Sequence, residues 1–269
     1  MRLRSLFESV VGKKVIAAVT GAMMLLFLVG HVAGNLKVFL ADPEPGVADI
    51  DAYGAFLRTV GEPAIPNGAV LWTVRIVLFL AVVLHVVCVV QLARHNRAAR
   101  PVGYRETNYE RATRPARWMM VSGLAVLGFI IFHILHFTTG SIEPSTFRDG
   151  AIYSNLYAAF TRWPFVVLYV MAMAFIAMHL YHGAWSMFQS LGLDNPDRNR
   201  GLRALALVLS IGLFAGFTTV PFSFALGAME SRDEAAAVPV PAETGPPGTM
   251  ADADEVEVDP SDPMTGGDE

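Results

Sequence analysis

The chain has 269 residues, of which 54% are hydrophobic and only 16% are charged. Soluble domains carry about 25% charged residues, so this composition excludes an ordinary water-soluble enzyme. The net charge of −4 conceals a separation, because acidic and basic residues lie in different parts of the chain. The single cysteine, Cys88, excludes a disulfide framework, a thiolate zinc site and an iron–sulfur cluster held by this chain alone.

Five apolar runs are long enough to cross a bilayer, which takes about 20 residues. The predicted spans cover residues 15–38, 69–92, 118–138, 164–188 and 202–226. Prolines and acidic residues between the first two spans predict a polar loop with a short helix near residues 50–60, and residues 141–163 read similarly. The sequence therefore predicts an all-α integral membrane protein, a five-transmembrane-helix bundle over residues 1–229.

The basic N-terminus before an apolar run is also typical of a secretory signal peptide. This run is long, however, and its end holds His31, Asn35 and Lys37 instead of a small-residue cleavage site. We therefore expect it to remain in the protein as the first span.

Positive charge predicts the orientation of the spans, because cytoplasmic loops are rich in Lys and Arg. Fourteen of the twenty Lys and Arg residues lie before span one, between spans two and three, or between spans four and five, counting Arg203 at the very start of span five. The N-terminus is therefore predicted to be cytoplasmic, and five spans place the C-terminus outside. Residues 230–269 are rich in Pro, Gly, Ala, Asp and Glu, which predicts a disordered acidic outer tail, most simply one without a specific role.

Four of the seven histidines lie inside the predicted spans, at two depths. At about 1.5 Å per residue, His31 and His133 lie about 23 Å from the cytoplasmic face. His85 and His179 lie about 10–14 Å from that face, because spans two and four run inward. Ionisable residues inside a span are costly and generally functional, so four histidines paired by level favour a functional role over structural hydrogen bonding.

Two histidines at one level on facing helices are what a b-type haem needs, because its iron takes one axial nitrogen from each side of the ring. The sequence thus predicts two bis-histidine haems b. Depth alone leaves the ligand set open, because His136 and His182 each lie three residues after a candidate ligand and share much of its helix face. His95, at the inner boundary, is expected to be interfacial.

Other polar residues are candidates for contacts to a haem propionate or a quinone. The outer candidates are Lys37, Arg75, Glu62 and His136, and the inner candidates are His182, Trp185 and Gln189. Arg75 and Lys37 have a simpler alternative, which is to extend to the outer membrane interface. A second haem at the outer level is useful only if electrons must travel there, which favours an outer quinone site.

Four segments of the chain carry a family resemblance. They are Gly-His31-Val-Ala-Gly-Asn35-Leu-Lys37, Arg75-Ile with His85 ten residues on, Phe132-His133-Ile-Leu-His136, and His179-Leu-Tyr-His182-Gly183-Ala-Trp185-Ser186. Over about residues 5–228 the chain resembles the cytochrome b membrane-anchor subunit of succinate dehydrogenase and fumarate reductase (respiratory complex II). The form that it resembles is the single-chain, five-helix, two-haem type found in bacteria. The acidic tail has no counterpart in that pattern.

The resemblance implies that the first histidine of each close pair is the ligand. It implies an inner haem between His85 and His179 and an outer haem between His31 and His133, which agrees with the two depths. Position 182 is not a ligand in that family, so the role of His182 stays open.

The resemblance also implies partners. A flavoprotein with FAD and an iron–sulfur protein would bind on the cytoplasmic face of a bacterial cytoplasmic membrane, and electrons would pass through both haems to a quinone, expected to be menaquinone. This chain carries no dinucleotide-binding glycine motif and no cysteine cluster, so we expect it to hold no catalytic residue of its own. We expect no nucleic-acid partner.

Two alternatives belong to other classes. One is a cytochrome b anchor of a different quinone-linked dehydrogenase, where the donor usually lies outside; the basic cytoplasmic surface here favours a cytoplasmic donor. The other is a haem-free transporter or membrane anchor. The visible spectrum of the purified chain distinguishes them, because two bis-histidine haems give sharp α-bands.

Overall fold

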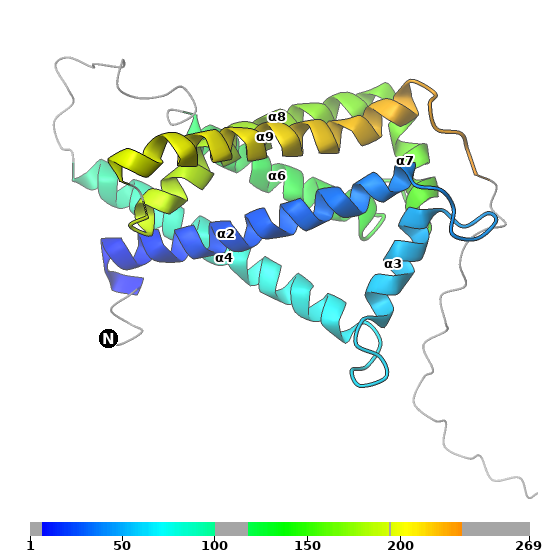
Figure 1. Cartoon of the computed structure of the whole chain (residues 1–269), viewed down its shortest axis with the longest axis horizontal. Helices are drawn as coiled ribbons and strands as arrows, with labels where there is room; N and C mark the ends of the chain where they lie inside the picture. Colours follow the sequence, from blue (N-terminus) through cyan, green and yellow to red (C-terminus); the bar gives the residue numbers. More distant parts are fainter. Residues whose placement is uncertain (1–6, 100–117, 194, 233–269) are drawn as a thin grey trace, which may run out of the picture. The chain divides into compact units, whose positions relative to one another are not determined.

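The computed structural model describes residues 7–99, 118–193 and 195–232. In this part of the chain, all secondary-structure elements longer than a single β-bridge are helices (Figure 1). Five helices are long and apolar enough to cross a membrane. They are α2 (Val10–Asn35), α4 (Ala69–Ala98), α6 (Met119–Phe137), α8 (Trp163–Ser190) and α9 (Pro196–Ala225). The predicted all-helical, multi-pass architecture is confirmed.

Several long helices extend beyond the predicted apolar runs. Ser9 caps α2 by accepting a hydrogen bond from the Gly12 N–H at 2.9 Å, so the helix begins before its first lysines. At its other end, α4 continues through Arg94 and Arg97. Lys and Arg are good helix formers, so the backbone stays helical after the apolar stretch ends.

Helices α2 and α8 form the centre of the bundle. Helix α8 packs against α2, α6 and α9, and α2 also packs against α4. Within the described residues, α4 and α6 make no extensive contact with each other, and the same holds for α2 with α6 and for α4 with α8. Helix α2 therefore lies across the bundle from α6, and α4 lies across from α8. Side chains fill the space between the helices of each pair.

Large apolar side chains cover much of the outer surface of the long helices. Leu26, Phe79, Leu124 and Val208, one on each of four helices, are at least 65% exposed. A water-soluble protein rarely exposes such an extensive apolar surface. The helices therefore suit a lipid bilayer, where their backbone groups are satisfied internally.

One end of the bundle carries a folded cap made of η1 (Leu36–Phe39), α3 (Asp49–Thr59), α7 (Ile152–Phe160) and their loops. Both short helices lie in the loops that the sequence predicted to contain them. The largest buried cluster of the described residues joins this cap to α8 and α9. Its members are Val38, Ala48, Ile50, Tyr153, Leu156, Ala159, Phe160, Val166, Tyr169, Val220 and Phe224.

Polar contacts hold the cap together. Lys37 pairs with Asp49 at 2.9 Å, and the Tyr153 backbone N–H donates to Asp51 Oδ1 at 2.9 Å. Burial raises the pKa of the Asp51 carboxyl above its ordinary value, despite that hydrogen bond. Arg232 pairs with Asp42 of the cap, so the first residues of the predicted tail are attached; the rest of that tail, 233–269, lies outside the described residues.

Candidate functional site

The outer pair of histidines meets across the bundle. His31 on α2 and His133 on α6 have ring centres 5.9 Å apart and planes 78° apart. Phe27 stacks on His31 at 5.2 Å, and Phe129 lies 5.7 Å from His133. Imidazole–metal bonds are about 2.0–2.1 Å long, so two rings that bind one metal from opposite sides have centres about 6 Å apart. The spacing is therefore compatible with a shared iron.

The other two predicted ligands lie deeper, further from the cap. His85 on α4 and His179 on α8 are close enough to interact electrostatically. His85 Nδ1 lies 3.0 Å from the Ala17 carbonyl oxygen and 3.3 Å from Thr20 Oγ1. His179 Nδ1 lies 3.3 Å from Ser122 Oγ. Each ring therefore uses Nδ1 for a hydrogen bond, which favours Nε2 as a metal ligand.

Glycines give these two imidazoles space on the neighbouring helices. A Cβ at Gly21 would lie 3.5 Å from His85 Cε1, and a Cβ at Gly123 would lie 3.3 Å from His179 Cε1. The second distance is tighter than ordinary van der Waals contact. Glycine at these two positions lets each ring lie directly against the backbone of α2 or α6.

These contacts come from a sequence repeat that our sequence analysis missed. Residues 19–31 and 121–133 both begin Val-(Thr/Ser)-Gly, carry Phe at the ninth position and end in His. Aligning the segments that precede the first and third intramembrane histidines would have found it. In each segment a hydroxyl lies eleven residues before the outer histidine, about 16 Å along the helix. The repeat thus places both inner histidines at one level.

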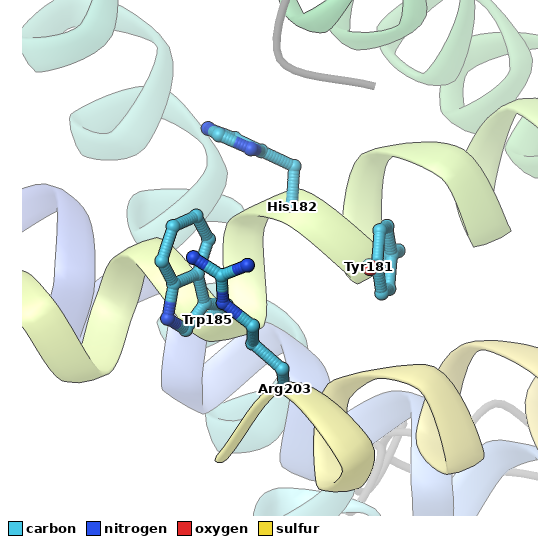
Figure 2. A pocket seen from close by; sticks show the side chains of 4 residues that line it. All are labelled: Tyr181, His182, Trp185 and Arg203. Carbon is cyan, nitrogen blue, oxygen red and sulfur yellow. The ribbon is translucent and has the colours of Figure 1, made fainter. Parts of the chain in front are cut away.

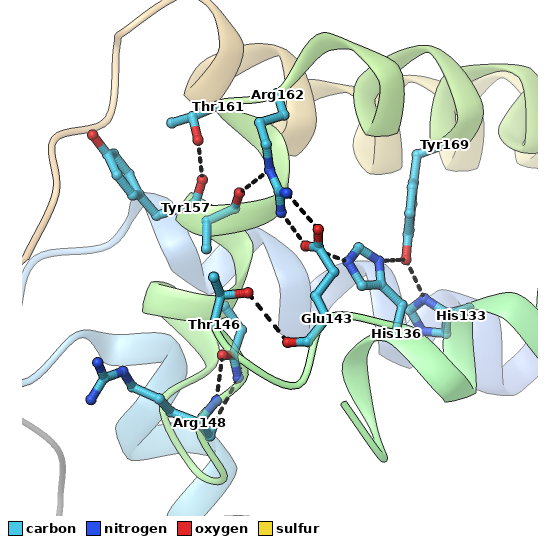
Figure 3. Close-up of polar contacts among 11 residues, drawn as sticks. His133, His136, Glu143, Thr146, Arg148, Tyr157, Thr161, Arg162 and Tyr169 are labelled. Carbon is cyan, nitrogen blue, oxygen red and sulfur yellow. Dashed lines mark hydrogen bonds and ion pairs between the residues drawn. The ribbon is translucent and has the colours of Figure 1, made fainter. Parts of the chain in front are cut away.

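His136 takes part in a polar chain that runs from His133 toward the cap (Figure 3). The Tyr169 hydroxyl lies 3.4 Å from His133 Nδ1 and 3.0 Å from His136 Nδ1. His136 Nε2 lies 3.7 Å from Glu143 Oε2, and Glu143 pairs in turn with Arg162. Both nitrogens of the buried His136 ring are thus engaged, which favours His133 as the ligand.

Glu143 is the charged end of this chain, in the loop before α7. The hydrogen bonds from Arg162 hold the pKa of the Glu143 carboxyl below its ordinary value. Glu143 is therefore anionic at neutral pH. Only the two histidines of this chain were predicted from sequence, because Tyr169, Glu143 and Arg162 come from separate segments with no shared motif.

His182 lines a small pocket at the other end of α8 (Figure 2). The pocket is lined by Tyr181, His182, Trp185 and Arg203. The Arg203 guanidinium lies 4.1 Å from the Trp185 ring centre, and both side chains donate to Asn199 Oδ1. The His182 ring lies nearly perpendicular to the Trp185 ring, with ring centres 6.1 Å apart. Its Nδ1 is buried without a hydrogen-bond partner among the described residues, a costly state that a ligand oxygen would relieve.

The remaining candidates lie away from the histidine pairs. Lys37 is held in the cap by Asp49, and Arg75 lies on an exposed face of α4 with its guanidinium 5.0 Å from the Trp72 ring centre. Arg75 therefore matches the interfacial alternative. Glu62 is exposed in the loop between α3 and α4.

Two further candidates lie at helix ends. Gln189 is exposed near the C-terminal end of α8, and His95 is exposed in the last turn of α4. The exposed position of His95 is the one expected for an interfacial residue. The basic loop residues 100–117, on which much of the predicted orientation depends, lie outside the described residues.

The paired imidazoles are donors of the kind that a haem iron takes. Within the described ranges, no three His, Cys, Asp or Glu side chains come together as a metal site. Two opposed imidazoles fit an iron whose other four bonds come from a macrocycle. No protein-family model, curated protein or solved structure matches the chain, so these side-chain contacts and the motif resemblance carry the functional argument.

Proposed function

We propose that the chain is the cytochrome b membrane-anchor subunit of a succinate:quinone oxidoreductase. The observation that carries the proposal is the placement of four intramembrane histidines as two pairs, on four helices and at two levels. His31 and His133 would hold the outer haem, and His85 and His179 the inner one. Bound haems would supply one-electron transfer between a cytoplasmic iron–sulfur subunit and a quinone, with menaquinone as the expected form.

The protein side chains would orient and insulate these groups. Hydrogen bonds at Nδ1 keep three of the four imidazoles in place, leaving Nε2 for iron. The unpartnered His182 Nδ1 lies one helical turn after His179, where a propionate of the inner haem would satisfy it. Neutral imidazole ligands keep charge out of the apolar bundle.

The chain from Tyr169 to Glu143 supports an outer quinone site. Quinone reduction consumes protons, so its site needs a proton route as well as a haem. Tyr169 and His136 provide hydrogen-bonding groups between His133 and the anionic Glu143. In this proposal they pass protons between the cap surface and a quinone beside the outer haem.

The proposed orientation follows from charge. Among the described residues, the basic residues in the first turns of α2, the last turns of α4 and the first turns of α9 lie at the end of the bundle opposite the cap, which favours a cytoplasmic location for that end and an external one for the cap in a bacterial cytoplasmic membrane. The same basic surface is suited to docking the iron–sulfur subunit, to which a flavoprotein with FAD would bind.

The test is to purify the tagged chain from its native membranes with its partners. We expect two haems b per chain in a pyridine haemochrome assay, a low-spin bis-histidine electron paramagnetic resonance (EPR) signal, and haem reduction by succinate. Co-purification of flavin and iron–sulfur clusters is part of the expected result.

Different outcomes contradict different parts of the proposal. A chain without α-bands overturns the cytochrome and leaves a haem-free anchor or transporter. Two haems reduced by hydrogen or formate instead of succinate keep the cytochrome and overturn the proposed partner.

A further inference from the structure

Two hydroxyl groups contact the inner histidines, and each donates its own hydrogen to a main-chain carbonyl instead of to the histidine. Thr20 Oγ1 donates to main-chain carbonyls of its own helix, 2.7 Å from Ile16 O and 3.2 Å from Ala17 O. Ser122 Oγ donates to Met119 O at 3.1 Å. A hydroxyl has one hydrogen and two lone pairs, so each oxygen is left to accept a hydrogen bond from its neighbour.

The neighbour in both cases is a histidine Nδ1. Thr20 Oγ1 and the Ala17 carbonyl oxygen both face His85 Nδ1, at 3.3 and 3.0 Å. A carbonyl oxygen can only accept, and the hydroxyl hydrogen is already used. His85 Nδ1 must therefore carry the hydrogen, which leaves the lone pair on Nε2.

Helix α6 repeats this arrangement around the other inner histidine. Ser122 Oγ lies 3.3 Å from His179 Nδ1, and the main chain of Met119 lies close enough to interact with that ring. In both helices the carbonyl comes from the residue three before the hydroxyl. Two segments far apart in sequence thus place a hydroxyl beside the Nδ1 atoms of histidines on two different helices, with a main-chain carbonyl three residues earlier.

We propose that Thr20 and Ser122 are positioning residues that hold His85 and His179 as their Nδ1–H tautomers and present both Nε2 atoms to the inner haem. This inference rests on the proposed function. The alternative is that both hydroxyls only satisfy their own helices, as buried Ser and Thr often do. Thr218 on α9 is a matched example, since its hydroxyl lies 2.7 Å from Phe214 O and 3.2 Å from Ala215 O.

The experiment compares Thr20→Ala with Thr20→Ser in the complete complex purified from membranes. Both variants lose the methyl group, and only the alanine variant loses the oxygen. Loss of an outer-shell partner typically weakens metal affinity about 10- to 100-fold. We expect inner-haem release to apomyoglobin to accelerate about 10- to 100-fold in Thr20→Ala, with a more positive inner-haem midpoint potential. Thr20→Ser and the control Thr218→Val should match the wild type.

Ser122→Ala provides an independent second variant, because it removes a single oxygen. We expect the same change in the inner haem, with the outer haem unaffected in both potential and EPR signal. Normal inner-haem release and potential in Thr20→Ala and Ser122→Ala overturn the inference, and so does an equal change in Thr218→Val. Failure of the proposed function looks different, because the wild-type complex would then either contain no haem or contain haems that succinate does not reduce.

Discussion

The two histidine pairs share one bundle but have different surroundings. The inner pair, His85 and His179, contacts hydroxyl and carbonyl oxygens of α2 and α6, which do not titrate. In the outer pair, His31 lies against aromatic rings, and His133 is joined through Tyr169 to a chain of ionisable groups.

In the proposed cytochrome, this difference supports different roles for the two pairs. A redox site that only relays electrons benefits from neighbours whose charge is fixed, whereas a site where protons are exchanged needs a titratable path to water. The hydroxyl and carbonyl contacts of the inner pair fit the first description, and the Tyr169–His136–Glu143 chain at the outer pair fits the second. The quinone chemistry is therefore expected at the outer pair.

The largest expected effect comes from removing a single axial ligand. His85→Ala or His179→Ala should leave one haem per chain, the outer one, and abolish succinate-driven quinone reduction, because the electron path is broken at its start. His31→Ala or His133→Ala should remove the outer haem. A pyridine haemochrome assay with a potentiometric titration measures both outcomes.

His95→Ala is the matched control and should keep both haems, because His95 is exposed at the end of α4. If His182→Ala lost a whole haem while His179→Ala kept two, the ligand assignment in α8 would be wrong.

The next effect separates the proton path from the electron path. Glu143→Gln removes the charge at the end of the outer chain, and we expect quinone reduction to fall by about 100-fold, the lower range for a lost proton-transfer group. Both haems should stay bound and should still be reduced by succinate. Steady-state assays with a soluble quinone, together with haem spectra, check this.

Asp149→Asn is the control, since Asp149 lies in the same loop and pairs with Arg58 at 3.1 Å but has no link to the histidines. Equal losses of turnover in both variants would show that altered loop structure causes the effect. That result would contradict a role for Glu143 in the proton path.

A smaller effect tests the space around the inner pair. Gly123→Ala places a Cβ 3.3 Å from His179 Cε1, so the ring must shift by a few tenths of an ångström. We expect a shifted EPR signal for the inner haem, and a weaker shift in Gly21→Ala, where the distance to His85 is 3.5 Å. Gly212→Ala, where an added Cβ meets nothing within 4 Å, should leave both haem signals unchanged.

The smallest effect concerns the cap. Burial raises the pKa of Asp51, so the folded protein disfavours its charged form, and this cost appears as pH rises through the folded-state value. Asp51→Asn keeps an acceptor for the Tyr153 N–H and should raise Tm by about 2 °C at pH 7. The gain should vanish below the ordinary pKa of Asp, where both states are protonated.

Asp49→Asn is the comparison for Asp51, because it removes the partner of Lys37 and should not raise Tm. Thermal unfolding followed by tryptophan fluorescence in detergent measures both variants. A higher Tm for Asp51→Asn at low pH as well would contradict the electrostatic explanation.

The sequence by itself determined the five spans, the two short helices in the loops and the two levels of intramembrane histidine. These features follow from local composition and from counting residues along a helix, so no knowledge of packing is needed. The ligand identities and the haems remain predictions drawn from those levels and from the family resemblance.

Only the tertiary structure decided which side chains surround each histidine. It joined His136 to Tyr169 and Glu143, paired Thr20 with His85 and Ser122 with His179, and left Arg75 on an exposed face. Such contacts depend on the rotation of each helix about its axis and on its choice of neighbours. Hydropathy leaves both undetermined, because a helix that is apolar on nearly all sides does not reveal which face packs inward.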